Sequence, residues 1–589
     1  MSTIQTVFLS NWQLGVAAIA IAFPLWRLTK KIISKSSGTN IANVPGPASP
    51  SWLVGNFLQV YNPAAWGFHE YLAQTYKMLS DFRPLVGTIS RLHAPFGGSA
   101  LYIYDPQVLQ NILIKVNYLM PTSSKKDLNS LSHHHRRQRK MLNPAFSATN
   151  IRAMTPTFFE VAHKLESTLK QRLQTGDSVQ EVDILSWMGR TALELIGQAG
   201  LGYSFDPLTN ESSAHPYSKI IKELLTTMER VAFWSIYVLP YVSRIGSPGF
   251  RRFVVNILPW KDLHQLRDMS DYMQSIAVKV YESKKLAFEA GDEAVAEQIG
   301  RGKDIISILM RENMKEVEGS DRLQENEVLG QVSASFHLYS CPTHVNLSSK
   351  MNTLIFAAMD TTSSAMTRII ELLSKHPETQ EKLRREIVEA KDQKDVQDLS
   401  YEELTNLPFL DAICRETLRL YAPVPTLARV ALQDAIVPLS NPITGLDGTE
   451  LHQVAIPKGT NIFISALNAN RNPDLWGKDA LEWKPERWLS PLPDALLEAH
   501  IPGVYSICYY YRCLLPGSLI RMTFLGGRRS CIGFTFSQLE MKVVISVLVE
   551  SFNFSPSKND SEIVWRMSGV SAPTTGGDTQ LPVILSLAS

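Results

Sequence analysis

The chain has 589 residues, a length that by itself favours several domains. Its 58 Lys and Arg residues nearly balance 56 Asp and Glu residues, and no basic stripe is interleaved with aromatic residues, so we expect no nucleic-acid partner. Only 5 cysteines are present, which argues against a disulfide-stapled fold.

The first predicted element is a membrane anchor at residues 7–26, which contain no charge. A helix of about 20 apolar residues can cross a bilayer. Arg27, Lys30, Lys31 and Lys35 follow at once and predict that the remainder of the chain lies on the cytosolic side. The alternative is a cleavable signal peptide, but residues 1–6 lack the positive charge that such a peptide carries.

A polar linker with the hinge Pro45-Gly46-Pro47 follows the anchor. We therefore divide the chain into an anchor (1–30), a linker and proline-rich hinge (31–50) and one large domain (51–589).

A basic run at residues 135–140 begins with His135 and includes Arg139, four positions later. In a helix these two side chains share one face. That shared face could bind an anionic group. Two other interpretations of the run are a solvated basic face and a metal site built from residues 133–135. Three consecutive histidines point in different directions on a helix, which disfavours the metal site.

An apolar helix is predicted over residues 351–375, ending before Pro377. Its middle contains Ala357, Ala358, Met359, Asp360, Thr361 and Thr362. A threonine within a helix can bond back to the carbonyl of the preceding turn and loosen the helix there. Such residues more often cap a helix, but here the apolar pattern continues on both sides.

Two aperiodic segments, residues 332–350 and about 507–521, interrupt otherwise continuous patterns. Valine codons begin with GT and a lysine codon can end in AG, so residues 332–350 have the borders of a translated intron. The alternative is that both segments are surface loops, which cost only about 0.6 kcal/mol per doubling of length. The connection over residues 115–135 is short.

Glu416 and Arg419 are three residues apart in a helical pattern over residues 401–420, so they share a face. Arg487 follows in the segment Pro485-Glu486-Arg487-Trp488. Exposed pairs of this kind contribute little to stability, so the pair matters only if it is buried.

Cys531 lies between glycines and ahead of a helical pattern over residues 534–552. A thiolate at a helix N-terminus is favoured by the backbone dipole and can hold an iron ion. Gly533 would let a flat ligand approach the backbone, and Arg529 offers a fork of donors to a carboxylate. A lone cysteine is otherwise a small buried apolar residue.

The pattern Phe524-x-x-Gly527-x-Arg529-x-Cys531-x-Gly533 resembles the haem-binding signature of the cytochrome P450 family. The pair Glu416 and Arg419 with Arg487, the run at 357–362, and His135 with Arg139 resemble further motifs of that family, in its order. Ala358 and His135 stand where the family more often has glycine and tryptophan. The resemblance implies a mainly α fold with small β-sheets (α+β), the cytochrome P450 fold, preceded by one N-terminal transmembrane helix.

The resemblance also implies a cofactor and a set of roles. Haem b would be held by the Cys531 thiolate, with Phe524 and Gly533 beside it. Its propionates would meet His135, Arg139, Arg429 and Arg529. Asp360 and Thr361 would serve oxygen activation and proton delivery, whereas Glu416, Arg419 and Arg487 would form a structural network.

The function implied is a monooxygenase that inserts one oxygen atom from O2 into a lipophilic small molecule. Electrons would come from NADPH through NADPH–cytochrome P450 reductase at the endoplasmic-reticulum membrane, with the catalytic domain in contact with membrane lipid on the cytosolic side. Two alternatives are a haem-thiolate isomerase or dehydratase, and an inactive, haem-free product of an imperfect gene translation. The expected pocket lining is Leu354, Ile355, Ala358, Val424, Pro425, Thr426, Leu427, Val570 and Ala572.

Overall fold

The computed structural model describes residues 40–78, 88–115, 119–120, 128–209, 215–242, 245–291, 293–294, 299–300, 302–315, 351–499, 522–558 and 562–588. The predicted anchor and the segments 332–350 and 507–521 lie outside these residues, as do residues 116–118 and 121–127 of the connection at 115–135. Among the described residues, no helix is both long and apolar enough to span a bilayer.

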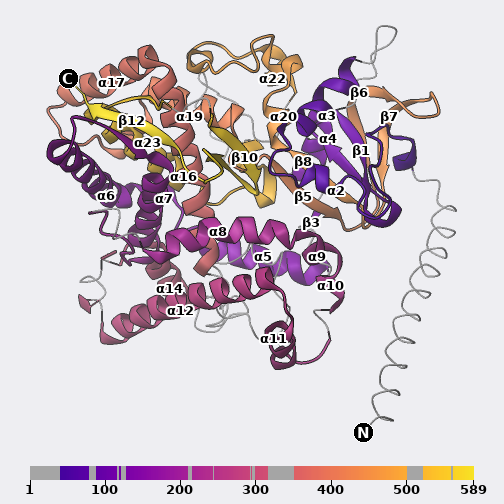
Figure 1. Cartoon of the computed structure of the whole chain (residues 1–589), viewed down its shortest axis with the longest axis horizontal. Coiled ribbons are helices and arrows are strands. Elements are labelled where there is room, and N and C mark those ends of the chain that lie inside the picture. Colours follow the sequence, from indigo (N-terminus) through magenta and orange to yellow (C-terminus); the bar gives the residue numbers. More distant parts are fainter. Residues whose placement is uncertain are drawn as a thin grey trace.

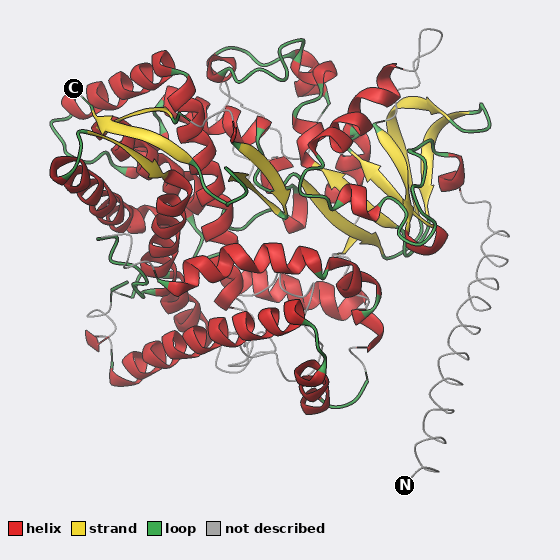
Figure 2. Cartoon of the chain, in the orientation of Figure 1, coloured by secondary structure: helices red, strands yellow, loops and turns green. Residues whose placement is uncertain are grey.

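Helices dominate the chain, and the expected mainly α fold with small sheets is confirmed (Figures 1 and 2). Their bounds are α2 (Phe57–Val60), α3 (Trp66–Met78), α4 (Pro106–Gln110), α5 (Leu128–Leu142), α6 (Ala148–Thr175), α7 (Ile184–Leu195), α8 (Pro216–Arg230), α9 (Ala232–Tyr237), α10 (Leu239–Val242), α11 (Pro248–Ile257), α12 (Lys261–Ala290), α14 (Ile305–Lys315), α16 (Met351–Lys375), α17 (Pro377–Asp392), α18 (Tyr401–Thr405), α19 (Pro408–Leu420), α20 (Ala466–Asn470), α21 (Pro473–Trp476), α22 (Asp494–Glu498) and α23 (Phe534–Ser551).

The strands form small sheets, of which the largest has the order β1-β2-β8-β5-β3. Within it β2 and β8 run parallel, whereas β1 with β2, β5 with β8 and β3 with β5 are antiparallel. The others are β10-β11, β4-β12-β9 and β6-β7. The bounds are β1 (Ile89–Ala94), β2 (Gly98–Ile103), β3 (Leu119–Met120), β4 (Val179–Asp183), β5 (Thr426–Ala431), β6 (Ala435–Thr444), β7 (Glu450–Ile456), β8 (Asn461–Ser465), β9 (Phe552–Pro556), β10 (Val564–Ser568), β11 (Val570–Thr574) and β12 (Pro582–Leu587).

Two apolar cores correspond to two regions of the molecule. The larger joins α6, α7, α16, α19 and α23, and the smaller lies beneath the sheet of β1, β2 and β8. Figure 1 shows this sheet with β6 and β7 at the right of the helical body, while α8 and α12 run side by side across the lower part of the view. The site lies where the helical core approaches β5.

Helix α16 has the bounds that its sequence predicts, and Pro377 occupies the first turn of α17 directly after it. The helical pattern over residues 401–420, in contrast, is not one helix. It divides into α18 and α19, and Pro408 stands in the first turn of α19. Proline lacks the N–H that an uninterrupted helix needs, which explains the break.

Candidate active site

Cys531 lies in a short loop between two 3₁₀ turns and α23. The turns are Met522–Phe524 and Gly527–Arg529. The backbone N–H of Cys531 donates to the carbonyl of Phe524 (2.7 Å), which closes the loop. The Phe524 ring packs edge-on against Phe534, with 4.9 Å between the ring centroids. The cysteine is therefore fixed just ahead of the first turn of α23.

Gly527 shows why the loop needs glycine. Its φ is +69°, and a Cβ atom there would lie 2.2 Å from the carbonyl oxygen of Leu113. Any other residue would suffer both a strained backbone and a clash with another backbone segment. At Gly533 a Cβ atom would meet only the Cys531 sulfur, at 3.9 Å. The face of the loop beside the sulfur is thus open, as a flat ligand requires.

The Cys531 side chain has accessible surface, yet burial raises the pKa of its thiol, while the Gly533 N–H and the nearby Arg139 act in the opposite direction. A side chain that faces an enclosed space rather than bulk solvent has both accessible surface and a pKa raised by burial. A thiol of raised pKa is protonated at neutral pH and becomes a thiolate when a metal ion binds it.

Three arginines gather around this loop. Arg139 of α5 donates to the carbonyl of Ser530 (2.5 Å). Burial and the charge of Arg139 lower the pKa of Arg529, and burial and the charge of Arg529 lower the pKa of Arg429 to about 10. Within the described residues, no carboxylate forms an ion pair with any of the three. Such a cluster of like charges is stabilised when an anionic ligand binds it. The two propionates of haem are carboxylates, which guanidinium groups bind well.

The structure brings together most of the predicted cofactor residues. Cys531, Arg139, Arg429 and Arg529 are linked by these contacts and charges, and Phe524 and Gly533 flank the sulfur. His135 lies one turn before Arg139 on α5 and is half-buried.

Glu416, Arg419 and Arg487 form the predicted network. Glu416 is fully buried and receives two hydrogen bonds of 2.8 Å from Arg419 and one of 3.3 Å from Arg487. The indole N–H of Trp488 donates to the same carboxylate (3.0 Å). No role was predicted for Trp488, although it directly follows Arg487.

This network reaches the cysteine loop through a chain of hydrogen bonds. Arg419 donates to the carbonyl of Asn470 (3.0 Å), and the Asn470 amide donates to the Thr523 hydroxyl (3.0 Å). Thr523 directly precedes Phe524, whose carbonyl holds the N–H of Cys531. The buried charges therefore support the loop that presents the sulfur.

On α16, Thr361 donates to the carbonyl of Ala357 (2.7 Å), as expected for a threonine within a helix. Burial raises the pKa of Asp360 to about 6, opposed by Lys222 of α8. The Lys222 ammonium donates to the carbonyl of Leu185 (3.4 Å) and packs over Gly189 of α7. Sequence analysis missed Lys222, since no local pattern relates it to Asp360.

The three expected pocket residues of α16 differ in burial. Ile355 is only 1% exposed and packs in the helical core, whereas Leu354 and Ala358 are half-buried. Residues 354 and 358 share one face of α16, and the next residue is turned by about 100° toward the core. Leu354 and Ala358 therefore share a half-buried face of α16, and Ile355 lies in the core.

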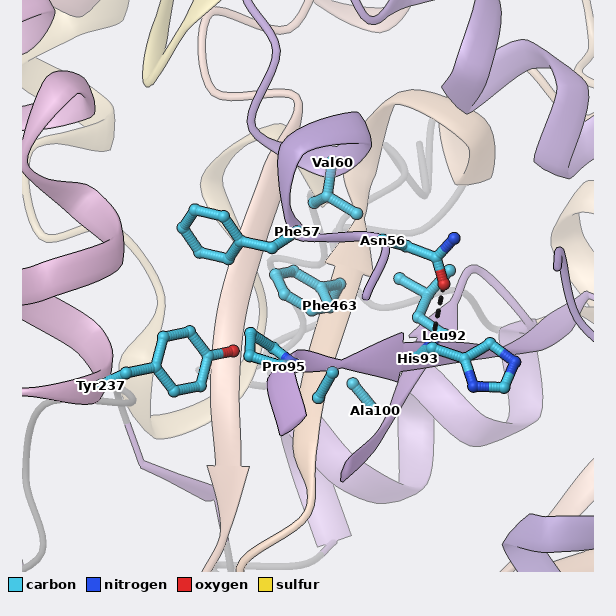
Figure 3. A pocket seen from close by; sticks show the side chains of 10 residues that line it. Asn56, Phe57, Val60, Leu92, His93, Pro95, Ala100, Tyr237 and Phe463 are labelled. Carbon is cyan, nitrogen blue, oxygen red and sulfur yellow. Dashed lines mark hydrogen bonds between the residues drawn. The ribbon is translucent and has the colours of Figure 1, made fainter. Parts of the chain in front are cut away.

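A separate small apolar hollow lies between α2, the β1–β2 hairpin, α9 and β8. Figure 3 shows Phe57, Phe463 and Pro95 around it, with the Tyr237 hydroxyl directed toward Pro95. It contains none of the predicted site residues.

The comparisons with known proteins agree with the family resemblance that the cysteine loop indicated. The family model described as Cytochrome P450 matches residues 45–580. The chain belongs to the cytochrome P450 family. It is 41% identical to cytochrome P450 monooxygenase 91 of Postia placenta over 572 residues, 95% of this chain and 96% of that relative. It is 38% identical to the ganoderic acid synthetase of Ganoderma lucidum over 582 residues, 97% of each chain.

A cytochrome P450 monooxygenase of Hericium erinaceus is 34% identical over 594 residues, 97% of this chain and 98% of that relative. The enzyme class follows from these matches: the protein is a cytochrome P450 monooxygenase. The family also implies haem with a cysteine thiolate ligand, a redox partner and a small-molecule substrate.

Proposed function

We propose that this P450 inserts one oxygen atom from O2 into a lipophilic small molecule. The other oxygen atom leaves as water, with NADPH as the two-electron donor; of the two protons that the water needs, NADPH supplies one and the solvent supplies the other. The observation that carries the proposal is Cys531, fixed in an open-faced loop beside three arginines that lack carboxylate partners among the described residues. A relative named for ganoderic acid synthesis supports a small organic substrate.

The residues around the loop hold the cofactor. The Cys531 sulfur ligates the iron, and Arg139, Arg429 and Arg529 bind the propionates. Gly533 leaves space for the macrocycle, and Phe524 closes the loop. When bound, the haem supplies the activation of dioxygen, which the electron donation of the thiolate favours.

The residues of α16 and its neighbours handle protons and exclude water. Asp360 has a pKa of about 6, so its carboxyl gains and loses a proton near neutral pH. Thr361 supplies a hydroxyl one residue further along the same turn. The half-buried side chains of Leu354, Ala358 and Leu427 offer apolar surface to a lipophilic substrate.

The proposal includes attachment to the endoplasmic-reticulum membrane by residues 1–30, with the catalytic domain on the cytosolic side. The uncharged stretch at residues 7–26 and the four cations after it support this orientation. NADPH–cytochrome P450 reductase in the same membrane is the proposed electron donor. Alkaline extraction of membranes from expressing cells tests attachment: the full chain stays in the pellet, and a variant lacking residues 1–30 is released.

Reconstitution of the full chain with the reductase tests the activity. A library of lipophilic compounds is screened for product, with O2 and NADPH consumption measured in parallel. Product formation that consumes both supports the proposal. Haem-loaded protein that converts a pre-oxidised compound without O2 or NADPH supports the isomerase or dehydratase. Protein that takes up no haem supports the inert gene product, and sequencing the transcript then shows whether residues 332–350 are encoded.

A further inference from the structure

A second carboxyl group, besides Asp360, lies next to the turn of α16 that carries Asp360, Thr361 and Thr362. Glu540 of α23 is fully buried, and its Oε1 atom lies 2.9 Å from the Thr362 hydroxyl. Its Oε2 atom has no hydrogen-bond partner among the described residues. Thr362 follows Thr361, so Glu540 supports the segment that carries the proposed proton-handling residues.

Glu194 of α7 shows how other buried carboxyl groups of this protein are surrounded by hydrogen-bond donors. It is 1% exposed and accepts hydrogen bonds from the Gln198 amide, the Ser204 hydroxyl and the backbone N–H groups of Phe205 and Asp206, at 2.5 to 2.7 Å. Glu540 is equally buried but has one hydroxyl contact and, within the described residues, no ion pair. A negative charge there would lack the donors that compensate for burial.

The number of protons in the contacts of Thr362 differs between the two protonation states of Glu540. The Thr362 hydroxyl is in close hydrogen-bond contact with the carbonyl of Ala358 and also with Glu540. A hydroxyl carries one proton, and a carbonyl oxygen carries none. If Glu540 carries a proton, each contact has one, because Thr362 donates to Ala358 and Glu540 donates to Thr362. If Glu540 is ionised, the single Thr362 proton has to serve both contacts.

We propose that Glu540 is a neutral carboxylic acid that donates its proton to Thr362 and so holds the Thr362 hydroxyl on the carbonyl of Ala358. Glu540 is a positioning residue, because it acts on the turn through Thr362. Thr361 engages the carbonyl of Ala357 in the same way, so two successive carbonyls of α16 are held beside Asp360. Burial raises the pKa of Glu540 well above its ordinary value, in agreement with the neutral state.

Ionisation of Glu540 would reverse the hydrogen bond. A carboxylate only accepts, so Thr362 would turn its proton toward Glu540 and release the carbonyl of Ala358. The geometry of the turn would then change without any change in the haem ligand. This function rests on the proposed monooxygenase reaction, whereas the protonation state is measurable in the resting protein.

Infrared difference spectroscopy on the ferric, haem-loaded full chain tests the protonation state without turnover. At about pH 8, roughly two units above the Asp360 pKa, Asp360 is mainly ionised. A carbonyl band of a protonated carboxyl that shifts in D2O is expected in the wild type. It is expected to disappear in Glu540→Gln and to remain in the matched control Glu194→Gln. An identical band in wild type and Glu540→Gln overturns the assignment.

Coupling of NADPH to product tests the positioning role in the reconstituted system. Glu540→Leu removes the donor to Thr362, and hydrogen peroxide released per NADPH is expected to rise severalfold. Glu540→Gln keeps an N–H donor and is expected to restore most of the coupling. The proposal fails if Glu540→Leu keeps the thiolate spectrum and the wild-type peroxide yield. Absence of any NADPH consumption in the wild type would instead contradict the proposed function.

Discussion

Replacement of Glu416 by glutamine tests the buried charge network with almost no change of volume. The carboxylate is fully buried and accepts from Arg419, Arg487, Trp488 and the backbone N–H of Lys484. The amide group of glutamine would present donors to these donors, and two arginines would lose their counter-charge. Arg419 is itself only 3% exposed, so water cannot replace the lost partner.

The magnitude follows from burial. Removing one partner of a buried ion pair costs about 3–5 kcal/mol. With an unfolding entropy of about 2.1 cal/mol/K per residue, a domain of roughly 500 residues loses about 1 °C of Tm per kcal/mol. We therefore expect Glu416→Gln to lower Tm by about 3–5 °C in scans at one fixed rate.

Glu486→Gln is the matched control, two residues from Trp488 in the same segment. Glu486 pairs with Lys382 at 2.7 Å, but the two side chains are 48% and 43% exposed. Exposed pairs contribute about 0–1 kcal/mol, so the expected change is at most about 1 °C.

The same variants test the link from Glu416 to the cysteine loop. Because the hydrogen-bond chain runs through Asn470 and Thr523, Glu416→Gln is expected to lower the fraction of haem with thiolate ligation, and Glu486→Gln is not. Equal Tm losses in the two variants would refute the burial argument. A lower Tm with full thiolate ligation would refute the link.

Three further predictions concern the loop and two titrating groups. Gly527→Ala is expected to lose haem, because its Cβ atom would lie 2.2 Å from the Leu113 carbonyl oxygen. The control is Gly448→Ala, since Gly448 also has a positive φ but has open space around it. Equal haem contents in the two variants would contradict the argument from the clash. Burial raises the pKa of Asp360 to about 6, so its proton is lost as pH rises through that value. Turnover of the wild type is expected to fall over this pH range. Turnover of Asp360→Asn is expected to show no such fall. Burial opposes protonation of His163, but its hydrogen bonds to Glu166 (2.7 Å) and Asp398 (2.8 Å) outweigh burial and raise its pKa. The stability that His163 contributes is therefore present below pH 6.5 and is lost as pH rises through the folded pKa. The Tm of His163→Gln should consequently depend less on pH than the Tm of the wild type. The same pH dependence in both proteins would contradict this.

The sequence predicted elements whose determinants are local. The period of α16 and the proline after it set its bounds, and the glycines around Cys531 indicated a tight loop. The division between α18 and α19 has a local cause in Pro408, but the apolar period alone continues across it.

Contacts between distant segments were beyond prediction from the sequence. Arg139 meets Ser530 across 391 residues, and Thr362 meets Glu540 across 178. A glutamate within the apolar helix α23 has no local sign of its protonation, which depends on how many donors the folded chain brings to it. The same holds for Lys222, whose effect on Asp360 depends on the packing of α8 beside α7 and α16.

The central claim is that the sulfur of Cys531 ligates the haem iron. The carbon monoxide difference spectrum of the reduced protein measures this directly, in the wild type and in Cys531→Ser. The wild type is expected to show the Soret band diagnostic of thiolate ligation, and Cys531→Ser to lack it. A thiolate-type band that persists unchanged in Cys531→Ser would contradict the account.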